Sequence, residues 1–171
     1  MRSLQPDATA VPEAVRPRGL ECRIPPPVVD GLCAALMYGA ARGTPAWEWH
    51  LPVAWRITLA LCAAACGMGM ALSGLGMFRK LRTTPDPLHP ARASRLAQDG
   101  VYRHTRNPMY LGMALVLLGW GCWLAHPLAL LCVPLAMAYL QRFQIRPEER
   151  LLHSRFGEAY ARYCRRVRRW L

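Results

Sequence analysis

The sequence has few acidic residues: 10 Asp and Glu stand against 22 Lys and Arg, which gives a formal charge of +12 at pH 7. A basic chain of this kind can be a nucleic-acid-binding arm or a disordered tail, but 53% of its residues are hydrophobic. The basic and the apolar residues also occupy separate segments. This segregation argues against nucleic acid as a partner and indicates a membrane protein with basic cytoplasmic segments.

Metal-binding patterns and a signal peptide are also missing. The seven cysteines form no C-x-x-C pair and have no histidines at the spacing of a zinc site, which needs four ligands. We therefore predict no metal site and expect the cysteines to act as packing residues. Residues 1–23 contain no uninterrupted apolar core, so they do not resemble a signal peptide, and we expect a flexible cytosolic tail there.

Charged residues are rare in four apolar segments, which cover about residues 24–42, 55–78, 108–125 and 127–141. A helix needs about 20 apolar residues to cross a bilayer, so the second segment is long enough and the first could cross a thinned bilayer. The last two are separated only by a His126-Pro127 turn and should form an antiparallel hairpin. We predict an all-α fold: a polytopic membrane bundle of about four transmembrane helices, forming one domain over 24–171.

Two polar segments complete the predicted fold. Residues 79–107 should form a loop, because their prolines prevent a continuous helix. After Pro147, apolar residues recur at steps of three and four within a basic segment: Leu152, Phe156, Tyr160, Tyr163, Val167 and Trp170. This period predicts an amphipathic helix over 147–171, continuous or broken at Gly157, that lies along an anionic surface or caps the bundle.

The distribution of Lys and Arg predicts the topology. Four precede the first apolar segment, seven lie in 79–107 and nine in 141–171, whereas 43–51 and 126–127 contain none. Cytoplasmic loops of membrane proteins are enriched in these residues. We therefore expect an integral membrane protein with both termini and the 79–107 loop in the cytosol. In a bacterium, it would lie in the inner membrane.

The boundary between the 79–107 loop and the third apolar segment is dense in polar residues. Pro108 suits the first turn of a helix, and Arg106 and Asn107 stand directly before it. The free amides of that turn, the positive end of the helix dipole and the Arg106 guanidinium could together bind a carboxylate or a phosphate. Basic residues and tyrosines are also ordinary topology and interface signals at a membrane boundary, so the local sequence leaves both interpretations open.

Four motifs in the second half of the chain occur in a specific order: Gly100–Arg103, Arg106–Gly112, Glu148–Leu152 and Phe156–Tyr160. Together they resemble the isoprenylcysteine carboxyl methyltransferase family. More broadly, they resemble the membrane methyltransferases that include phosphatidylethanolamine N-methyltransferase. The resemblance covers about residues 83–171 and extends more weakly to the two apolar segments before them. It implies methyl transfer from S-adenosylmethionine to a lipid-like or isoprenoid acceptor at the cytosolic membrane interface.

The resemblance also implies which residues bind the cofactor: Arg106, Pro108, Tyr110, Gly112, Glu148 and Glu149. Asn107 stands where the eukaryotic members have histidine, and it keeps the hydrogen bonding but not the titration of that residue. Tyr102 or Tyr110 could face the sulfonium through a cation–π contact. Arg106 suits the cofactor's carboxylate and a glutamate suits its ammonium or ribose.

We predict that Arg106 and Glu149 form one catalytic site although they are far apart in sequence. Arg106 precedes the third apolar segment and Glu149 follows the fourth, so the hairpin should bring both to the same end. Neighbouring helices lie about 8–10 Å apart, which lets one small molecule touch both residues.

Three alternative functions stay open. The first is phospholipid N-methylation, in which an amine acceptor must first lose a proton, with Glu149 as the candidate base. The second is an NADPH-dependent membrane reductase of isoprenoids or sterols, which is disfavoured because Glu148 and Glu149 would repel a 2′-phosphate. The third is a non-enzymatic membrane scaffold or a small transporter, although the apolar segments are almost free of the ionisable residues that transporters need. The sequence does not decide the oligomeric state.

Overall fold

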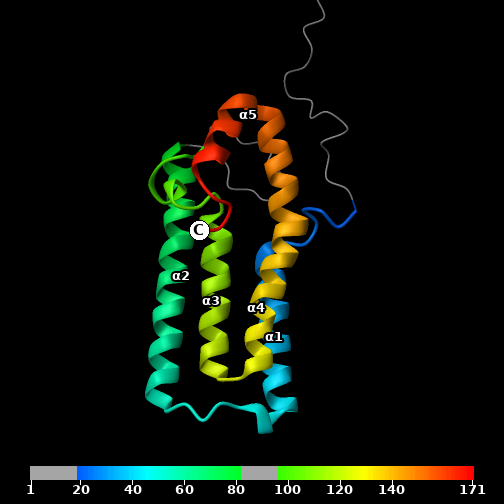
Figure 1. The fold of residues 1–171 in the computed structure, drawn as a ribbon, viewed down its shortest axis with the longest axis vertical. Helices are drawn as coiled ribbons and strands as arrows, with labels where there is room; N and C mark the ends of the chain where they lie inside the picture. Colours follow the sequence, from blue (N-terminus) through cyan, green and yellow to red (C-terminus); the bar gives the residue numbers. More distant parts are fainter. Residues whose placement is uncertain (1–18, 82–95) are drawn as a thin grey trace, which may run out of the picture.

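The computed structural model describes residues 19–81 and 96–171, and within these ranges every element is helical (Figure 1). The elements are α1 (Pro26–Gly43), η2 (Pro45–Trp47), α2 (Val53–Leu81), η4 (Gly100–Arg103), α3 (Pro108–Leu124), α4 (Pro127–Leu140), η5 (Gln141–Ile145) and α5 (Arg146–Arg166). The predicted all-α class is therefore confirmed for the described part of the chain. The rest of the predicted tail, 1–18, and of the predicted loop, 82–95, lies outside the described residues.

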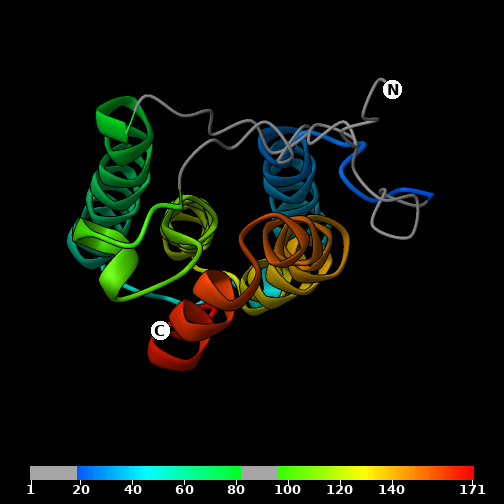
Figure 2. The same cartoon turned by 90° about the horizontal axis from the view of Figure 1, so that it is seen from above.

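The first four long helices alternate in direction, with α1 and α3 running one way and α2 and α4 the other (Figure 1). Seen from above, α2 and α3 form one side of the bundle, and α1 and α4 form the other (Figure 2). α3 is the central helix, because it packs against α1, α2 and α4. One core cluster joins α1, α3 and α4 through Met37, Leu117, Ala129, Val133 and Ala136. The predicted antiparallel hairpin is thus present, with its turn at His126.

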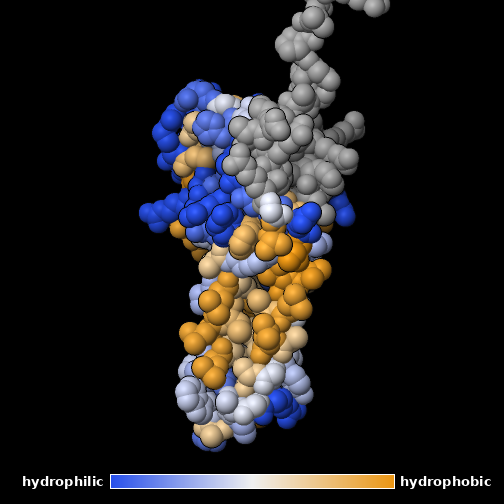
Figure 3. All heavy atoms as spheres, turned by 90° about the vertical axis from the view of Figure 1, so that its right-hand side faces the viewer, coloured by the Kyte–Doolittle hydropathy of each residue, from blue (hydrophilic) through white to orange (hydrophobic). Residues whose placement is uncertain are grey.

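The face of the bundle seen in Figure 3 is apolar along its middle and polar at its ends. Large apolar side chains point outward, including Leu36 of α1, Leu61 of α2 and Leu135 of α4, each about two-thirds exposed. Two helical stretches are long and apolar enough to cross a membrane, Val53–Lys80 and Pro127–Arg166, and Pro108–Leu124 is apolar but shorter. The described chain thus has the surface and the helices of a membrane protein.

α4 and α5 form one continuous helical stretch, in which η5 is a π-helical turn. The helix predicted over 147–171 begins within one residue of its expected start but ends before its expected end. The helix continues directly from α4, and it stops at Arg166, after which Val167 is extended. Gly157 has φ 49° and ψ −124°, a conformation in which a side chain is strained, so the helix breaks there and α5 folds back over the bundle (Figure 1).

Residues 19–23 differ from the flexible tail expected over 1–23. Glu21 is buried and forms ion pairs with Arg142 (3.1 Å) and Arg150 (2.5 Å). Cys22 is also buried, and its backbone N–H donates to the carbonyl of Phe143 at 2.9 Å. The end of the predicted tail is therefore held against η5 and α5. A buried carboxylate such as that of Glu21 needs cationic partners. These partners come from distant parts of the chain, so the local sequence could not identify them.

The end of the bundle opposite α5 is tied by polar contacts. The buried imidazole Nε2 of His126 lies 2.9 Å from the carbonyl oxygen of Thr44, which links the hairpin turn to the segment after α1. Arg56 donates from Nε and Nη2 to the carbonyl of Trp123, at 2.9 and 2.7 Å, and pairs with Glu48 at 2.7 Å. Arg56 lies inside the predicted 55–78 segment, so this end carries a cation that the topology argument did not weigh.

Glycines allow α2 and α3 to approach closely. A Cβ atom added to Gly67 would lie 2.5 Å from the carbonyl oxygen of Gly112, and one added to Gly112 would lie 2.5 Å from that of Gly67. Gly74 is packed in the same way against Pro108, with a contact of 3.1 Å. Gly69 faces open space. Gly67 and Gly74 therefore pack helices, as small residues commonly do in membrane bundles.

We expect Gly67→Ala to lower the thermal stability of the detergent-solubilised protein. The added methyl group must push α2 and α3 apart, and overpacking of this kind costs about 1–3 kcal/mol. Gly69→Ala is the matched control in the same helix: it meets no atom and should keep or raise the melting temperature. Equal melting temperatures for the two variants would contradict the close helix contact.

Candidate functional site

The structure brings Arg106 and Glu149 together at the polar end of the bundle. Arg106 lies in the turn before α3, and Glu149 lies in the first turn of α5. The Nη2 atom of Arg106 is 3.2 Å from Oε1 of Glu149, and both side chains are largely buried, with 13% and 16% exposed. The hairpin argument is confirmed in this respect, because two residues that flank its far ends form an ion pair.

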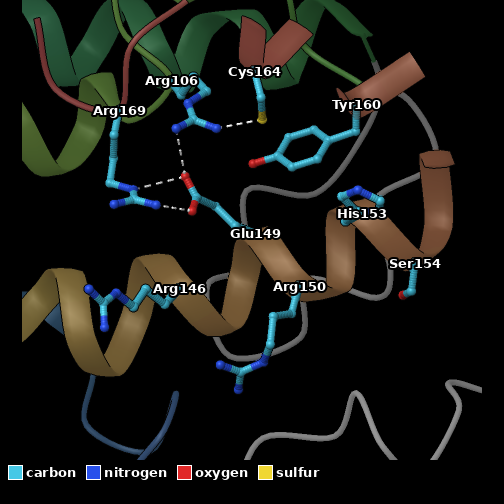
Figure 4. A pocket seen from close by; sticks show the side chains of 9 residues that line it. All are labelled: Arg106, Arg146, Glu149, Arg150, His153, Ser154, Tyr160, Cys164 and Arg169. Carbon is cyan, nitrogen blue, oxygen red and sulfur yellow. Dashed lines mark hydrogen bonds and ion pairs between the residues drawn. The ribbon is translucent and has the colours of Figure 1, made fainter. Parts of the chain in front are cut away.

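A second arginine, Arg169, binds the same carboxylate. Its Nε donates to Oε1 of Glu149 at 3.1 Å and its Nη2 donates to Oε2 at 2.6 Å (Figure 4). Such side-by-side contacts between a guanidinium and a carboxylate are among the strongest hydrogen-bonded pairs. The hydrogen bond with Glu149 also raises the pKa of Arg169 above its usual value. Glu149 is thus shared by two guanidinium groups.

These groups line an open pocket of about 650 Å³, a size typical of small-molecule sites. Its lining comes from the turn before α3, from α5 and from the segment after α5: Arg106, Arg146, Glu149, Arg150, His153, Ser154, Tyr160, Cys164 and Arg169 (Figure 4). The lining thus holds four arginines and one histidine but one carboxylate, and of these arginines Arg106 and Arg169 bind Glu149, whereas Arg150 pairs with Glu21. The pocket is therefore suited to a ligand that carries an anionic group.

Sequence reasoning missed most of the pocket wall. Tyr160 was assigned to the apolar stripe and Cys164 to packing, and both line the pocket. The Nη1 atom of Arg106 donates to the sulfur of Cys164, so this thiol is part of the arginine's surroundings. The Nε atom of Arg106 is buried and has no hydrogen-bond partner among the described residues, which leaves one donor for a ligand.

The C-terminal segment (residues 167–171) forms one edge of the site. The backbone N–H of Arg106 donates to the carbonyl of Arg168 at 3.0 Å. The carbonyl of Arg169 accepts from the Thr105 hydroxyl at 3.2 Å and from the Asn107 amide at 2.9 Å. Asn107 therefore holds the C-terminal segment and is not among the residues that line the pocket. Its predicted contact with the cofactor stays a prediction.

Tyr102, Tyr110 and Glu148 form a second cluster beside the pocket. The Tyr110 hydroxyl donates to the Glu148 carboxylate, and the carbonyl of Tyr102 accepts from the Tyr163 hydroxyl at 2.8 Å. Glu148 lies beyond the apolar part of its helix, which ends at Leu140, and burial raises its pKa to about 8 although the Tyr110 hydrogen bond lowers it. Burial, with smaller effects of Tyr163 and Glu148, raises the pKa of Tyr102. The two glutamates thus face different surroundings.

Pro108 and Gly112 lie in the contact between α2 and α3. Pro108 begins α3, as predicted, and is buried against Gly74. Gly112 packs on Gly67. Neither residue lines the pocket, so the first turn of α3 does not form the anion receptor in this arrangement. Of the eight predicted cofactor residues, the structure brings only Arg106 and Glu149 into the pocket.

The geometry permits a defined kind of binding. A cation, an anion and a cation stand in a row as Arg106, Glu149 and Arg169, and each can exchange its partner for an oppositely charged group of a ligand. A zwitterion with a carboxylate and an ammonium matches this row, because each new contact replaces an existing one of the same sign.

Comparisons with known proteins identify the family. The sequence model of a family described as phospholipid methyltransferase matches residues 55–159, which is more than half of the chain. A relative from Haemophilus influenzae, described as an uncharacterized protein, is 48% identical over 63 residues, covering 37% of this chain and 100% of that protein. No solved structure matches the chain. The matched region contains the α3–α4 hairpin, Arg106 and Glu149, and it agrees with the resemblance drawn from the motifs. The chain belongs to the phospholipid methyltransferase family, which consists of membrane methyltransferases.

Proposed function

We propose that this protein transfers a methyl group from S-adenosylmethionine to a lipid-like or isoprenoid acceptor at the cytosolic face of the membrane. The observation that carries the proposal is the Arg106–Glu149–Arg169 row in an open pocket at the polar end of an apolar bundle. The family match supports methyl transfer as the reaction class. The acceptor is proposed as an isoprenoid carboxylate, by the motif resemblance, or alternatively as a phospholipid amine, by the description of the matched family.

The residues present fit the amino-acid end of the methyl donor. Arg106 keeps one buried donor without a partner among the described residues, and with Arg169 it can bind a carboxylate. Glu149 can then bind the ammonium group. Tyr160 is the aromatic residue of the pocket lining, and it takes the place that we had predicted for Tyr102 or Tyr110 beside a sulfonium. When bound, the cofactor supplies an electrophilic methyl group.

The chain contributes alignment more than acid–base chemistry. Methyl transfer needs the acceptor in line with the departing group, and fixed orientation supplies much of the acceleration in such reactions. A carboxylate acceptor needs no base. An amine acceptor must lose a proton, and both carboxylate oxygens of Glu149 are already engaged by Arg106 and Arg169. Glu148 does not replace it in this arrangement, because its carboxylate is bound by the Tyr110 hydroxyl and it is not among the residues that line the pocket.

We further propose that α1 to α4 all cross the membrane as one domain over 24–171 and that both termini are cytosolic. The support is the excess of Lys and Arg in the tail, in 79–107 and in 141–171. The pocket is at that same end. A water-soluble donor would then enter from the cytosol, while the acceptor enters from the bilayer.

Sealed inside-out membrane vesicles and intact spheroplasts that contain the protein test this proposal. We expect methyl-labelled S-adenosylmethionine to label a lipid-soluble product in the vesicles only, because the donor cannot cross the membrane. Mass spectrometry of the labelled lipid then separates an ester from an N-methylated amine. Vesicles without the protein are the control, and labelling in spheroplasts alone would refute the orientation.

Binding to purified protein separates the proposed activity from the reductase. At a hundredfold excess over the dissociation constant, a ligand stabilises the folded state by about 2.7 kcal/mol. We expect S-adenosylmethionine or its demethylated product to raise the melting temperature in detergent, and NADPH to leave it unchanged. A melting temperature that responds to NADPH alone would instead support the reductase.

A further inference from the structure

The C-terminal segment (residues 167–171) is fixed to the site by its backbone as well as by its side chains. Its carbonyl groups at 168 and 169 accept from Arg106, Thr105 and Asn107 on the turn before α3. The indole N–H of Trp170 donates to the side chain of Gln141 at 2.9 Å, and its ring packs beside the cluster that contains Tyr110. The segment therefore joins the start of α3 to η5.

This anchoring places the Arg169 side chain in the pocket opposite Arg106. The two guanidinium groups bind Glu149 from different sides, and Arg169 is the more accessible of the two, with 31% of its side chain exposed against 13% for Arg106. Arg169 can therefore move when a ligand enters, whereas Arg106 is enclosed by Glu149 and Cys164. The more exposed arginine is the one that comes from the C-terminal segment.

We propose that the C-terminal segment is a wall of the donor pocket, that Arg169 is a binding residue for the carboxylate of the donor, and that Asn107 is a positioning residue that acts through Arg169. The inference rests on the proposed function, since the ligand is the methyl donor. Two of the nitrogens of Arg106 already contact Glu149 and Cys164. Its remaining nitrogen, Nε, has no partner among the described residues and can contact only one oxygen of a ligand carboxylate. Arg169 supplies the planar pair of donors that such a ligand needs.

Asn107 fits the positioning role because it is not among the residues that line the pocket, while its side chain hydrogen-bonds to the C-terminal segment. Its amide donates to the carbonyl of Arg169, which fixes the Cα atom from which the guanidinium extends. Removing the amide should leave the Arg169 side chain intact but place it less accurately. The effect of Asn107→Ala on ligand affinity should accordingly depend on the presence of Arg169.

Titration of the full-length protein with the demethylated product of S-adenosylmethionine tests the proposal. We expect Arg169→Ala to weaken binding at least about tenfold, as loss of charge-assisted hydrogen bonds does, and Arg169→Lys to restore only part of it. Asn107→Ala should weaken binding in the wild type and have little further effect in Arg169→Ala. Arg165→Ala is the control, because Arg165 pairs with Glu158 on the exposed side of α5 and should leave the affinity unchanged.

Hydrogen exchange supplies a readout that a purely structural role would not change. We expect bound ligand to slow the exchange of the amides of 167–171 in the wild type, and to slow it less in Arg169→Lys, which remains folded. Full affinity in both Arg169 variants, or exchange that ignores the ligand, would overturn the inference while leaving the proposed function intact. A wild-type protein that binds no donor would overturn the proposed function and this inference together.

Discussion

Glu149→Ala is expected to abolish most binding of S-adenosylmethionine and to destabilise the protein. Without the carboxylate, Arg106 and Arg169 face one another across the pocket with no shared counter-charge. Removal of one partner from a buried ion pair costs about 3–5 kcal/mol, and the partial exposure of this group lowers the expected loss to about 2–3 kcal/mol. Titration of labelled donor and thermal unfolding in the same detergent measure the two effects.

Arg106→Ala should also abolish most binding, and the double variant should cost much less than the two single variants combined. Residues that serve one ligand are not additive, because the first loss already removes the contact that the second would break. The exposed pair of Glu158 and Arg165 is the control, and its loss should not change binding. Unchanged affinity in either single variant would remove that residue from the site.

Glu148 should make the stability of the protein fall as the pH rises. Burial raises its pKa from 4.5 to about 8, so the folded state binds the proton more tightly than the unfolded state does. This contribution is fully present below pH 4.5 and is lost progressively as the pH rises to about 8. Each pKa unit corresponds to about 1.4 kcal/mol, so even part of this shift is measurable.

We therefore expect Glu148→Gln to be no more stable than the wild type at pH 5 and clearly more stable at pH 8 to 9. The amide keeps an acceptor for the Tyr110 hydroxyl and cannot ionise. Melting temperatures across this pH range give the comparison. Glu158→Gln is the control, because Arg165 lowers the pKa of Glu158 and its carboxylate is exposed. Parallel curves for the wild type and Glu148→Gln would show that Glu148 titrates normally.

The sequence was sufficient for the helices and for one pair of site residues. The scarcity of charged residues located α1 to α4, and the short turn at His126 required α3 and α4 to be antiparallel. From that geometry alone, Arg106 and Glu149 had to emerge at the same end, and they form an ion pair. The argument succeeded because it depended on chain direction and helix length, which a sequence with long apolar segments specifies well.

The sequence was insufficient for the remaining pocket wall, because that wall depends on where the chain goes after α5. A helical period continued through Val167 and Trp170 in the sequence, but the backbone leaves the helix after Arg166 and runs back to Asn107. The only local signal was Gly157, which permits the fold-back without requiring it. For this reason the sequence did not distinguish Arg169 from the other basic residues of the C-terminal region, whereas the structure shows that it binds Glu149.

The π-helical turn of η5 determines which single-residue deletions between the hairpin and Glu149 would move that side chain. A π-turn holds one more residue than an α-turn, and each residue of an α-helix advances about 100° around the axis. Gln144 and Ile145 are fully buried in that turn, and the Gln144 amide donates to the carbonyl of Ile24 at 2.6 Å. Deleting one residue within η5 would turn the π-turn into an α-turn and leave Glu149 facing nearly the same way, because the π-turn absorbs the extra residue. Deleting one residue from the regular helix of α4 would instead rotate Glu149 by about 100°, away from both arginines. The spacing between the hairpin and the glutamates is thus as much a part of the site as the charges themselves.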